Sequence, residues 1–390
     1  MENIFDTTLD ISSVDDTMIE ELNLNDYGSL DVEIKEPHMK ISTKEFSEAL
    51  KIAKSVLSSN SKDLISRSVL LKIENGVLYL YCTDFDIYLK LKLNVLNTEN
   101  TLSDTVIFPL DSMMQLLKAV PSTTIISKKE DSYYINLVGG NVILETHTVD
   151  ESKFKFTDNM NISDKTINSS DLYNIIKDFS PLVSSAISPS EKRIVFSNKV
   201  ISTYMLSSIS ADLDLPELDL RVKDMTILKQ LTNLEKEEEL SIYFGSNGRC
   251  AIKGENFNYT FLTSDLKTNK TLLDILDKQD YSNGLYIDYL SFYKLIELSA
   301  ELNYSTGKVL VSIREDACEV TFKTRKGNDS VLTLEGLKEG TVNPIEKEVQ
   351  SKLLRILLKS FTGESQVKVN LSEESLVITS DKYKGVLFLS

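Results

Sequence analysis

The feature that most constrains the fold of this chain is a recurring order of one helical segment followed by several strand-like runs. Six segments carry apolar residues at the i, i+3, i+4 spacing of an amphipathic helix, and their starts lie about 60 residues apart. In the first of them, Phe46, Leu50 and Ala53 lie on one stripe. The six predicted helices are 44–58, 110–120, 170–183, 222–234, 288–302 and 347–361.

Between these helices the sequence alternates apolar and polar residues, as strands with one buried face do. Two such runs, VLLKIENGVLYLYCTDFDIYLKLKL and YYINLVGGNVILETHTV, contain the turn dipeptides Asn75-Gly76 and Gly139-Gly140 that join hairpin strands. The repeating unit is therefore a strand, a helix and three more strands. One helix for four strands excludes a parallel βαβ sheet, and a period near 60 with one helix excludes a helical solenoid. We predict an α+β fold of antiparallel sheets with helices on one face.

Two units together have the length of an ordinary domain. We predict three domains, at 38–160, 161–275 and 276–390, after an acidic and disordered tail at 1–37. The tail holds eleven acidic side chains against the single Lys35. It could compete with a phosphate polyanion for lysines of its own chain, dock on a partner through the stripe Val14, Met18, Ile19 and Leu22, or only keep the chain soluble.

The net charge of −16 argues at first against nucleic acid, because phosphate binding depends on Lys and Arg. The tail accounts for −10 of this charge and leaves about −6 for the body, which can still carry one basic face. No basic and apolar leader begins the chain, and no run of about 18 apolar residues occurs. We therefore expect a cytoplasmic protein without a membrane partner.

The sequence carries no pattern that is typical of an enzyme. His38 and His147 are the only histidines, and neither lies in a metalloprotease or nucleophile-elbow motif. Asp84 and Asp86 share a strand face but have no further ligands nearby, so a solvated face is favoured over a metal site. We predict no catalytic residue, no metal and no cofactor.

Two further patterns have structural explanations. Cys82, Cys250 and Cys318 lie far apart in strand-like runs, without the paired spacing of zinc or redox sites, so we predict buried free thiols. Gly245-Ser246-Asn247-Gly248 precedes a strand, whereas a phosphate loop precedes a helix.

The order of elements resembles that of the bacterial β-clamp family, the β subunits of DNA polymerase III. The resemblance covers about 38–390. It rests on KISTKEFSEALKIAKSVLSSN, on SVLLKIENGVLYLYCTDFDIYLKLKL with its Thr83-Asp84 dipeptide, on HTVDESKFKF, and on the final strand KGVLFLS. The run KVISTYMLSSISADL lacks the family's Thr-Asp-Gly-His-Arg type of sequence, and the acidic tail is extra. These departures indicate a divergent member of the family, and a bacteriophage genome is one origin that fits them.

The resemblance implies a non-enzymatic sliding clamp of three DNA-clamp domains, with sheets outside and helices lining a ring. Its partners would be duplex DNA of any sequence, a DNA polymerase and a clamp loader. Six helices at a spacing of roughly 10 Å leave about 9 Å clear inside a circle, whereas twelve leave about 28 Å, so a ring around a duplex needs a homodimer. The acidic body keeps open an alternative, an interaction scaffold with clamp domains that does not encircle DNA.

Two sets of candidate residues follow from the helices and from the resemblance. The predicted DNA-binding residues are basic positions on the polar faces of the helices: Lys51, Lys54, Lys118, Lys177, Lys229, Lys352, Arg355 and Lys359. The family binds partner peptides where the second and third domains meet, and by position this pocket would contain Met205, Leu206, Leu262, Leu266, Val386, Leu387, Phe388 and Leu389. Since side chains alternate along a strand, one pair of the last four must fill the core.

Overall fold

The computed structural model describes residues 36–389, apart from 59, 98, 138–139, 189–190, 197–198, 206, 214–215, 235–236, 246–247, 264–269, 303–306 and 324–328. The predicted acidic tail therefore lies almost wholly outside the described residues. Among the described residues, no helix is both long and apolar enough to span a membrane.

The elements follow the predicted order of one strand, one helix and three strands. The first two units are β1 (His38–Ser42), α1 (Thr43–Val56), β2 (Ser68–Glu74), β3 (Val77–Thr83), β4 (Tyr88–Leu93), and β5 (Val106–Pro109), α2 (Leu110–Leu116), β6 (Thr123–Lys129), β7 (Ser132–Leu137), β8 (Gly140–Ile143). Short 3₁₀ turns add η2 (Ile65–Arg67), η3 (Leu117–Ala119) and η4 (Glu151–Phe154).

The next two units are β9 (Met160–Asn168), α3 (Ser169–Ser185), β10 (Arg193–Phe196), β11 (Val200–Tyr204), β12 (Ser207–Ala211), and β13 (Leu218–Arg221), α4 (Val222–Thr232), β14 (Glu239–Gly245), β15 (Arg249–Lys253), β16 (Phe257–Leu262). A short helix, α5 (Lys270–Asp277), follows them.

The last two units are β17 (Gly284–Asp288), α6 (Tyr289–Leu302), β18 (Lys308–Ile313), β19 (Ala317–Lys323), β20 (Asp329–Glu335), and β22 (Ile345–Gln350), α7 (Ser351–Lys359), β23 (Gln366–Leu371), β24 (Ser375–Thr379), β25 (Lys384–Phe388). A three-residue strand, β21 (Leu337–Glu339), precedes the sixth unit.

All strand pairs within the sheets are antiparallel, and each unit lends its first strand to the sheet of its neighbour. β1 pairs with β6 and β5 with β2; β9 pairs with β14 and β13 with β10; β22 pairs with β18 and β17 with β23. The fourth strand of every unit is thereby left at an outer edge. At two places these fourth strands pair with each other, β4 with β16 and β12 with β25.

This pairing produces four sheets. An eight-stranded sheet, β5-β2-β3-β4-β16-β15-β14-β9, joins the first two units to the middle two, and a nine-stranded sheet, β13-β10-β11-β12-β25-β24-β23-β17-β21, joins the middle two to the last two. Four-stranded sheets, β1-β6-β7-β8 and β20-β19-β18-β22, lie at the two ends. The predicted α+β fold with βαβββ repeats is confirmed. The predicted domain boundaries stay predictions.

Local sequence explains several element ends. Ser42 caps α1 by accepting from the backbone N–H of Glu45, and Asn168 caps α3 by accepting from that of Ser170 at 2.9 Å. The predicted hairpin at Asn75-Gly76 is confirmed, since both residues have positive φ, 53° and 81°. Such a two-residue turn matches the twist of antiparallel strands.

The prediction for the last helix was wrong at its N-terminal end. It starts at Ser351 and not near residue 347, because Ile345–Gln350 forms β22 and pairs with β18. Val349 is buried and lies four residues before Leu353, so its position satisfies both the helical and the strand period. The sequence pattern also missed α5.

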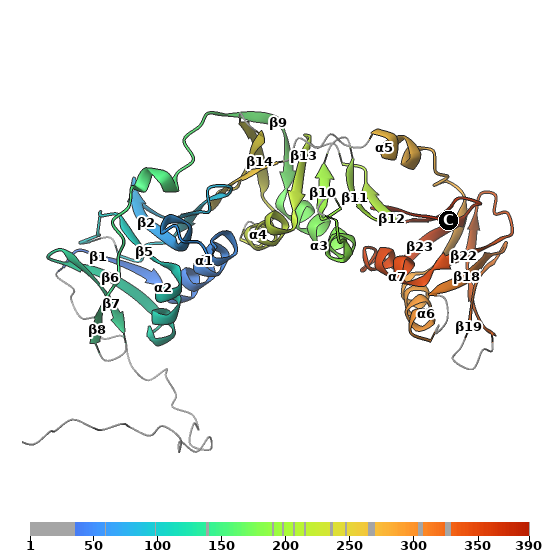
Figure 1. Ribbon diagram of the computed structural model, residues 1–390, viewed down its shortest axis with the longest axis horizontal. Helices are drawn as coiled ribbons and strands as arrows, with labels where there is room; N and C mark the ends of the chain where they lie inside the picture. The colour runs from blue at the N-terminus through green and yellow to red at the C-terminus, as the bar shows by residue number, and fades with distance from the viewer. Residues whose placement is uncertain are drawn as a thin grey trace, which may run out of the picture.

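Figure 1 shows the chain as an arc, with the sheets on its outside and α1, α4, α3 and α7 along its concave side. The core lies between the two layers and includes Phe46, Phe179, Phe292 and Phe361, all fully buried. Cys82, Cys250 and Cys318 are buried free thiols, as predicted, and burial raises the pKa of each.

We expect Phe46→Ala to lower the free energy of unfolding by about 3–5 kcal/mol, because it leaves a cavity in the core. The ring of Phe46 is fully buried, with its centroid 6.3 Å from that of Phe108. Urea denaturation of the isolated protein measures this loss. Leu64→Ala is the control, since Leu64 is 46% exposed and its loss should change the free energy by about 0.5 kcal/mol or less. Equal effects of the two variants would contradict the packing described here.

Candidate nucleic-acid interface and partner surface

The helices on the concave side form one continuous row. Contacts within the pairs of units join α1 to α2, α3 to α4 and α6 to α7, and contacts between the pairs join α1 to α4 and α3 to α7. The order along the arc is therefore α2, α1, α4, α3, α7, α6. Each helix buries its apolar stripe against a sheet, so its polar face is turned to the concave side (Figure 1).

The eight predicted DNA-binding residues all lie on this row of helices or on η3. Six are exposed, namely Lys51, Lys54, Lys118, Lys177, Lys352 and Lys359, and two are half-buried, Lys229 and Arg355. Lys229 Nζ lies 5.7 Å from the ring centroid of Tyr173. Within the described part of the chain, none of the eight forms an ion pair with a carboxylate. Their charge is thus available to an external anion.

The lysines of the sheets differ from those of the helices in this respect. Lys72 Nζ lies 2.9 Å from Glu151 Oε1, and Lys128 Nζ lies 2.5 Å from Asp104 Oδ2. Further pairs join sheet or loop lysines to carboxylates: Lys90–Glu74, Lys92–Glu255, Lys155–Glu74, Lys199–Asp277, Lys308–Glu348, Lys347–Glu373, Lys368–Glu339 and Lys384–Asp212. Carboxylates of the chain therefore neutralise much of the positive charge on the sheets, but not that of the eight basic residues on the concave row.

The helical row is not uniformly basic. On α6, Lys294 and Glu301 are exposed, and Glu297 accepts a hydrogen bond from Tyr293 at 3.1 Å. Lys223, at the start of α4, bonds the carbonyl oxygen of Val56 at 2.7 Å and pairs with Asp84. Lys223 thus ties α4 to the first two units.

Asp84 has a structural role that the sequence did not reveal. Its Oδ1 accepts from the backbone N–H groups of Asp86, at 3.1 Å, and Ile87, at 2.8 Å, while Oδ2 pairs with Lys223. These bonds close the turn between β3 and β4, where Phe85 has a φ of 72°. The predicted solvated face is therefore wrong for Asp84, which is half-buried and ion-paired. Asp86 is exposed.

The last strand separates its side chains into two layers. Leu387 is buried in the main core and Leu389 packs against it, whereas Val386 and Phe388 belong to a cluster on the outer face of the nine-stranded sheet. The structure thus decides the alternative that the sequence left open. Leu387 and Leu389 fill the core, and Val386 and Phe388 face the outside of the sheet.

This outer cluster contains four residues that the sequence did not single out. Ile201, Leu276 and Val377 are buried around Val386, with Tyr281 packed beside them. Leu276 belongs to α5, and the hydroxyl of Tyr281 donates to its carbonyl oxygen at 2.8 Å. Burial and the nearby carboxylates of Asp277 and Asp212 raise the pKa of Tyr281. The apolar pattern of TLLDIL was the available signal.

The other predicted pocket residues are divided among three places. Met205 is 62% exposed in the turn after β11, close to the cluster because Ser207 pairs with Leu387. Leu262 lies in the eight-stranded sheet, where it lines a cavity with Tyr88 and Arg249, so the structure does not bring it to Val386. Leu206 and Leu266 lie outside the described residues.

The histidines lie in structural settings. The Nδ1 of His147 is 2.8 Å from the hydroxyl oxygen of Ser68, and the Nδ1 of His38 is 3.0 Å from the carbonyl oxygen of Glu36. In the described ranges, no group of three His, Cys, Asp or Glu residues is arranged to hold a metal ion.

Comparison with known proteins defines the fold. No family sequence model matches the chain, and no curated protein matches it in sequence. Solved structures do match: the DNA polymerase III β subunit of Pseudomonas aeruginosa superposes with a TM-score of 0.73 at 15% identity, covering 90% of this chain and 99% of that one. The Thermotoga maritima β subunit gives 0.72 at 14% identity, with the same coverage of 90% and 99%.

A third match is the β clamp of Helicobacter pylori bound to a DNA ligase peptide, with a TM-score of 0.72, 14% identity, and coverage of 90% and 99%. The chain therefore has the fold of a DNA sliding clamp. In particular, it has the fold of the bacterial DNA polymerase III β subunit, in a strongly diverged sequence.

We expect Leu276→Asp to release α5 from the sheet, because a buried carboxylate without a partner is costly there. Hydrogen exchange measured by mass spectrometry should show faster exchange in 270–280 and unchanged exchange in the strands of the main core. Ile275→Asp is the matched control, because Ile275 is 39% exposed and adjacent in sequence. Unchanged exchange in the Leu276 variant would contradict the docking of α5.

Proposed function

We propose that this chain is the subunit of a non-enzymatic DNA sliding clamp, in which two copies close head to tail around duplex DNA. The observation that carries the proposal is the pairing of fourth strands. Both internal junctions join two such strands, β4 with β16 and β12 with β25. The fourth strands that remain are β8 and β20, and they are the outer edges of the two end sheets. The same pairing between two copies closes a ring.

The exposed side chains at the two ends support this closure. Ile143 on β8 is 63% exposed and Val331 on β20 is 56% exposed. On α6, the last helix of the row, Leu290, Leu298 and Leu302 are exposed at helical spacing. An unpaired apolar edge is an association site unless it is covered. In the proposed ring, β8 of the second copy pairs with the edge strand β20, and α2 of the second copy covers the exposed leucines of α6.

The cations of the concave row support a sliding contact with DNA. Lys51, Lys54, Lys352 and Lys359 are exposed and have no carboxylate partner in the described part of the chain. Flexible lysines attract phosphates without reading bases, so the ring would hold duplex DNA of any sequence. Lys118, Lys177, Lys229 and Arg355 complete the proposed lining.

We propose the outer cluster around Val386 and Phe388 as the docking surface for a polymerase and a clamp loader. The exposed Met205 and the half-buried Phe388 and Tyr281 supply apolar contacts of the kind that anchor short peptides. The Helicobacter pylori clamp, of similar fold, binds a DNA ligase peptide. A cytoplasmic location, in a bacterium or a phage-infected cell, is part of the same proposal.

A scaffold that does not encircle DNA is the second candidate. The acidic body and the carboxylates Glu297 and Glu301 of α6 favour it. The two functions differ in their behaviour on circular DNA, because a closed ring leaves a circle only by opening but slides off the ends once the circle is cut.

We expect a dimer in solution, and we expect Ile143→Asp or Val331→Asp to give monomers, because each places a charge in the closing edge. Light scattering coupled to size-exclusion chromatography at micromolar concentration measures the mass. Ile162→Asp is the control, since Ile162 is 64% exposed on β9 at neither end of the arc. A 44.0 kDa monomer for the unaltered chain would remove unassisted closure.

We expect loader-dependent retention on a nicked plasmid and loss of retention when the plasmid is cut. Replacing Lys51, Lys54, Arg355 and Lys359 by Glu should abolish most of this retention, because it reverses the charge of the lining. The melting temperature should stay nearly unchanged, because Lys51, Lys54 and Lys359 are exposed and the half-buried Arg355 has no ion-pair partner in the described part of the chain. Retention that survives cutting would favour the scaffold, and unaltered loading of the Glu variant would show that these side chains face away from DNA.

A further inference from the structure

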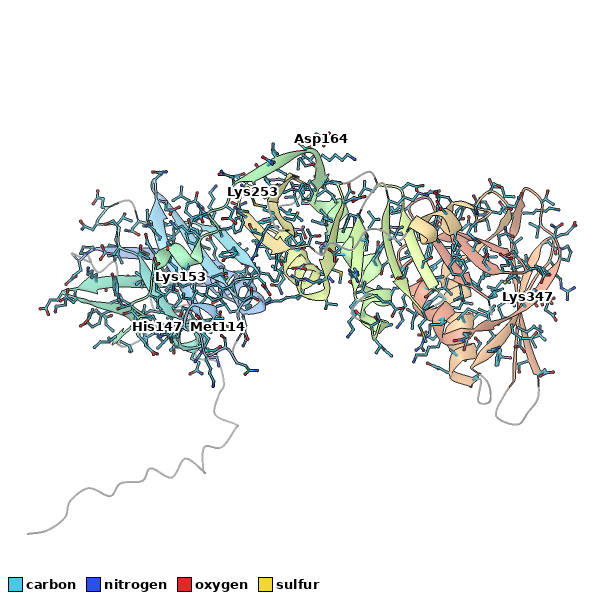
Figure 2. The ribbon with its side chains drawn as sticks, turned by 45° about the horizontal axis from the view of Figure 1, so that its top comes forward. Met114, His147, Lys153, Asp164, Lys253 and Lys347 are labelled. Atoms are coloured by element: carbon cyan, nitrogen blue, oxygen red, sulfur yellow. The ribbon has the colours of Figure 1, made fainter. Side chains whose placement is uncertain are left out.

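The outer face of the eight-stranded sheet carries cations at the β4–β16 junction. Asn258 on β16 pairs in register with Lys90 on β4 and with Lys253 on β15, so two lysines flank it in one row. Arg249 lies on the same face, in register with Leu262. We name Lys90, Arg249 and Lys253 the outer basic face. Figure 2 labels Lys253 on the convex side of the arc, away from the helices.

The chain contains an internal control for this face, because the β12–β25 junction repeats the same geometry. The turns before β4 and β12 each contain a residue with positive φ two positions after a threonine, Phe85 at 72° after Thr83 and Met205 at 51° after Thr203. With the turns matched, Lys90 corresponds to Ser210.

The strand registers extend this correspondence. Lys253 corresponds to Thr379, since Lys253 pairs with Asn258 as Thr379 pairs with Lys384. Arg249 corresponds to Ser375 in the same way, through Leu262 and Phe388. Three cations thus stand where the equivalent junction has hydroxyl side chains. The fold itself does not require them.

The charge of the outer basic face is only partly neutralised. Glu74 lies 3.1 Å from Lys90 Nζ and 2.6 Å from the neighbouring Lys155 Nζ, so one carboxylate serves two lysines. Partial burial opposes its ionisation, but hydrogen bonds from Lys155, Tyr81 and Lys90 hold the pKa of Glu74 at about 2. Lys253 has no carboxylate within ion-pair distance in the described ranges.

Burial and the charge of Lys90 lower the pKa of Lys253. An anion bound between the two lysines would relieve this repulsion. At the other junction the cations Lys384 and Lys199 pair with Asp212 and Asp277, so each of these two lysines has a carboxylate. The surplus of positive charge is therefore particular to the β4–β16 junction.

Aromatic rings alternate with these cations. Lys90 Nζ lies 3.7 Å from the ring centroid of Tyr79, and Lys253 Nζ lies 3.9 Å from that of Tyr243. The Arg249 guanidinium lies 5.6 Å from the ring centroid of Tyr88. Beside it, a cavity of about 260 Å³ is lined by Tyr88, Lys155, Phe156, Thr157, Asp158, Arg249 and Leu262. Cations interleaved with aromatic rings are the composition of surfaces that bind single-stranded nucleic acid.

The outer basic face continues toward the concave row of helices. Arg249 donates to the carbonyl oxygens of Phe85 and Asp86, in the turn between β3 and β4. Asp84 of the same turn pairs with Lys223 at the start of α4. Cations thus flank this turn on its sheet side and on its helix side, although Asp86 and Asp158 add negative charge at the rim.

We propose that the outer basic face binds single-stranded DNA, with phosphates between Lys90 and Lys253 and beside Arg249, and with bases against the tyrosine rings. An acidic peptide would also pair with these cations, but it carries no bases to stack on the tyrosine rings, so the alternation of cations and rings favours single-stranded DNA. The proposal rests on the proposed function in one respect: a single strand that emerges from the ring would lie beside the outer basic face. Binding of a free strand requires no ring.

The test uses the double variant Lys90→Ser, Lys253→Thr in the full chain, which installs the residues of the equivalent junction. Fluorescence anisotropy measures the affinity for a labelled oligothymidylate of about 16 nucleotides. We expect about tenfold weaker binding in 0.1 M salt, with the slope of log affinity against log salt reduced by about 1.4, since two phosphate contacts are lost. Lys384→Asn, which installs the equivalent of Asn258, is the matched control and should bind as the unaltered chain does.

Two results would overturn the proposal: the double variant binds the oligonucleotide as the unaltered chain does, or Lys384→Asn loses as much affinity as the double variant. In the first case, a loss of affinity for a synthetic peptide of residues 1–35 would make the face a peptide site. Retention of the double variant on the nicked plasmid, measured in parallel, reports the ring separately. A normal ring with unchanged oligonucleotide binding would refute only this inference.

Discussion

The pairing of fourth strands across the two junctions holds the three pairs of units in one arc (Figure 1). Main-chain hydrogen bonds between β4 and β16, and between β12 and β25, each join two smaller sheets into one long sheet, and two four-stranded sheets remain at the ends. Because sheet hydrogen bonds fix both spacing and direction, each junction sets the angle between neighbouring pairs of units. The helices are carried along on one side, and their contacts between α1 and α4 and between α3 and α7 follow. The same rule leaves β8 and β20 as the two free ends.

The placement of charge depends on this layered arrangement. Many lysines on the sheets lie within ion-pair distance of a carboxylate, as Lys72 does of Glu151 in η4. Apart from Lys223, which pairs with Asp84, the described lysines on the helices of the concave row have no carboxylate within ion-pair distance. A chain with a net charge of −16 can therefore present, on one side, a row of lysines that are not paired with its own carboxylates. Net charge alone gives no measure of such a surface.

The two junctions share a backbone and differ in the chemistry of their outer faces. At β12–β25 the outward positions include Ile201, Val377 and Val386, covered by Leu276 of α5. At β4–β16 the corresponding face carries Lys90, Arg249 and Lys253. The two junctions have the same backbone geometry but different outward side chains. The fold therefore does not require the side chains that differ, and these are the ones that a ligand would select. The core positions keep their apolar character in both copies, whereas the outward positions are free to vary.

Periodicity and turn chemistry are local properties of the chain, so the residues alone predicted the unit, its repetition and its turns. The sequence placed the hairpin at Asn75-Gly76 correctly and five of the six helices within a few residues. It failed at Val349, whose position fits a strand and a helix equally well, and at Asp84, whose partner Lys223 is 139 residues away. It identified the lysines of the helices but not Leu276, nor the separation of Leu262 from Val386. Those features depend on which strands meet across a junction, and main-chain pairing between distant segments leaves no local signature in the residues that it brings together.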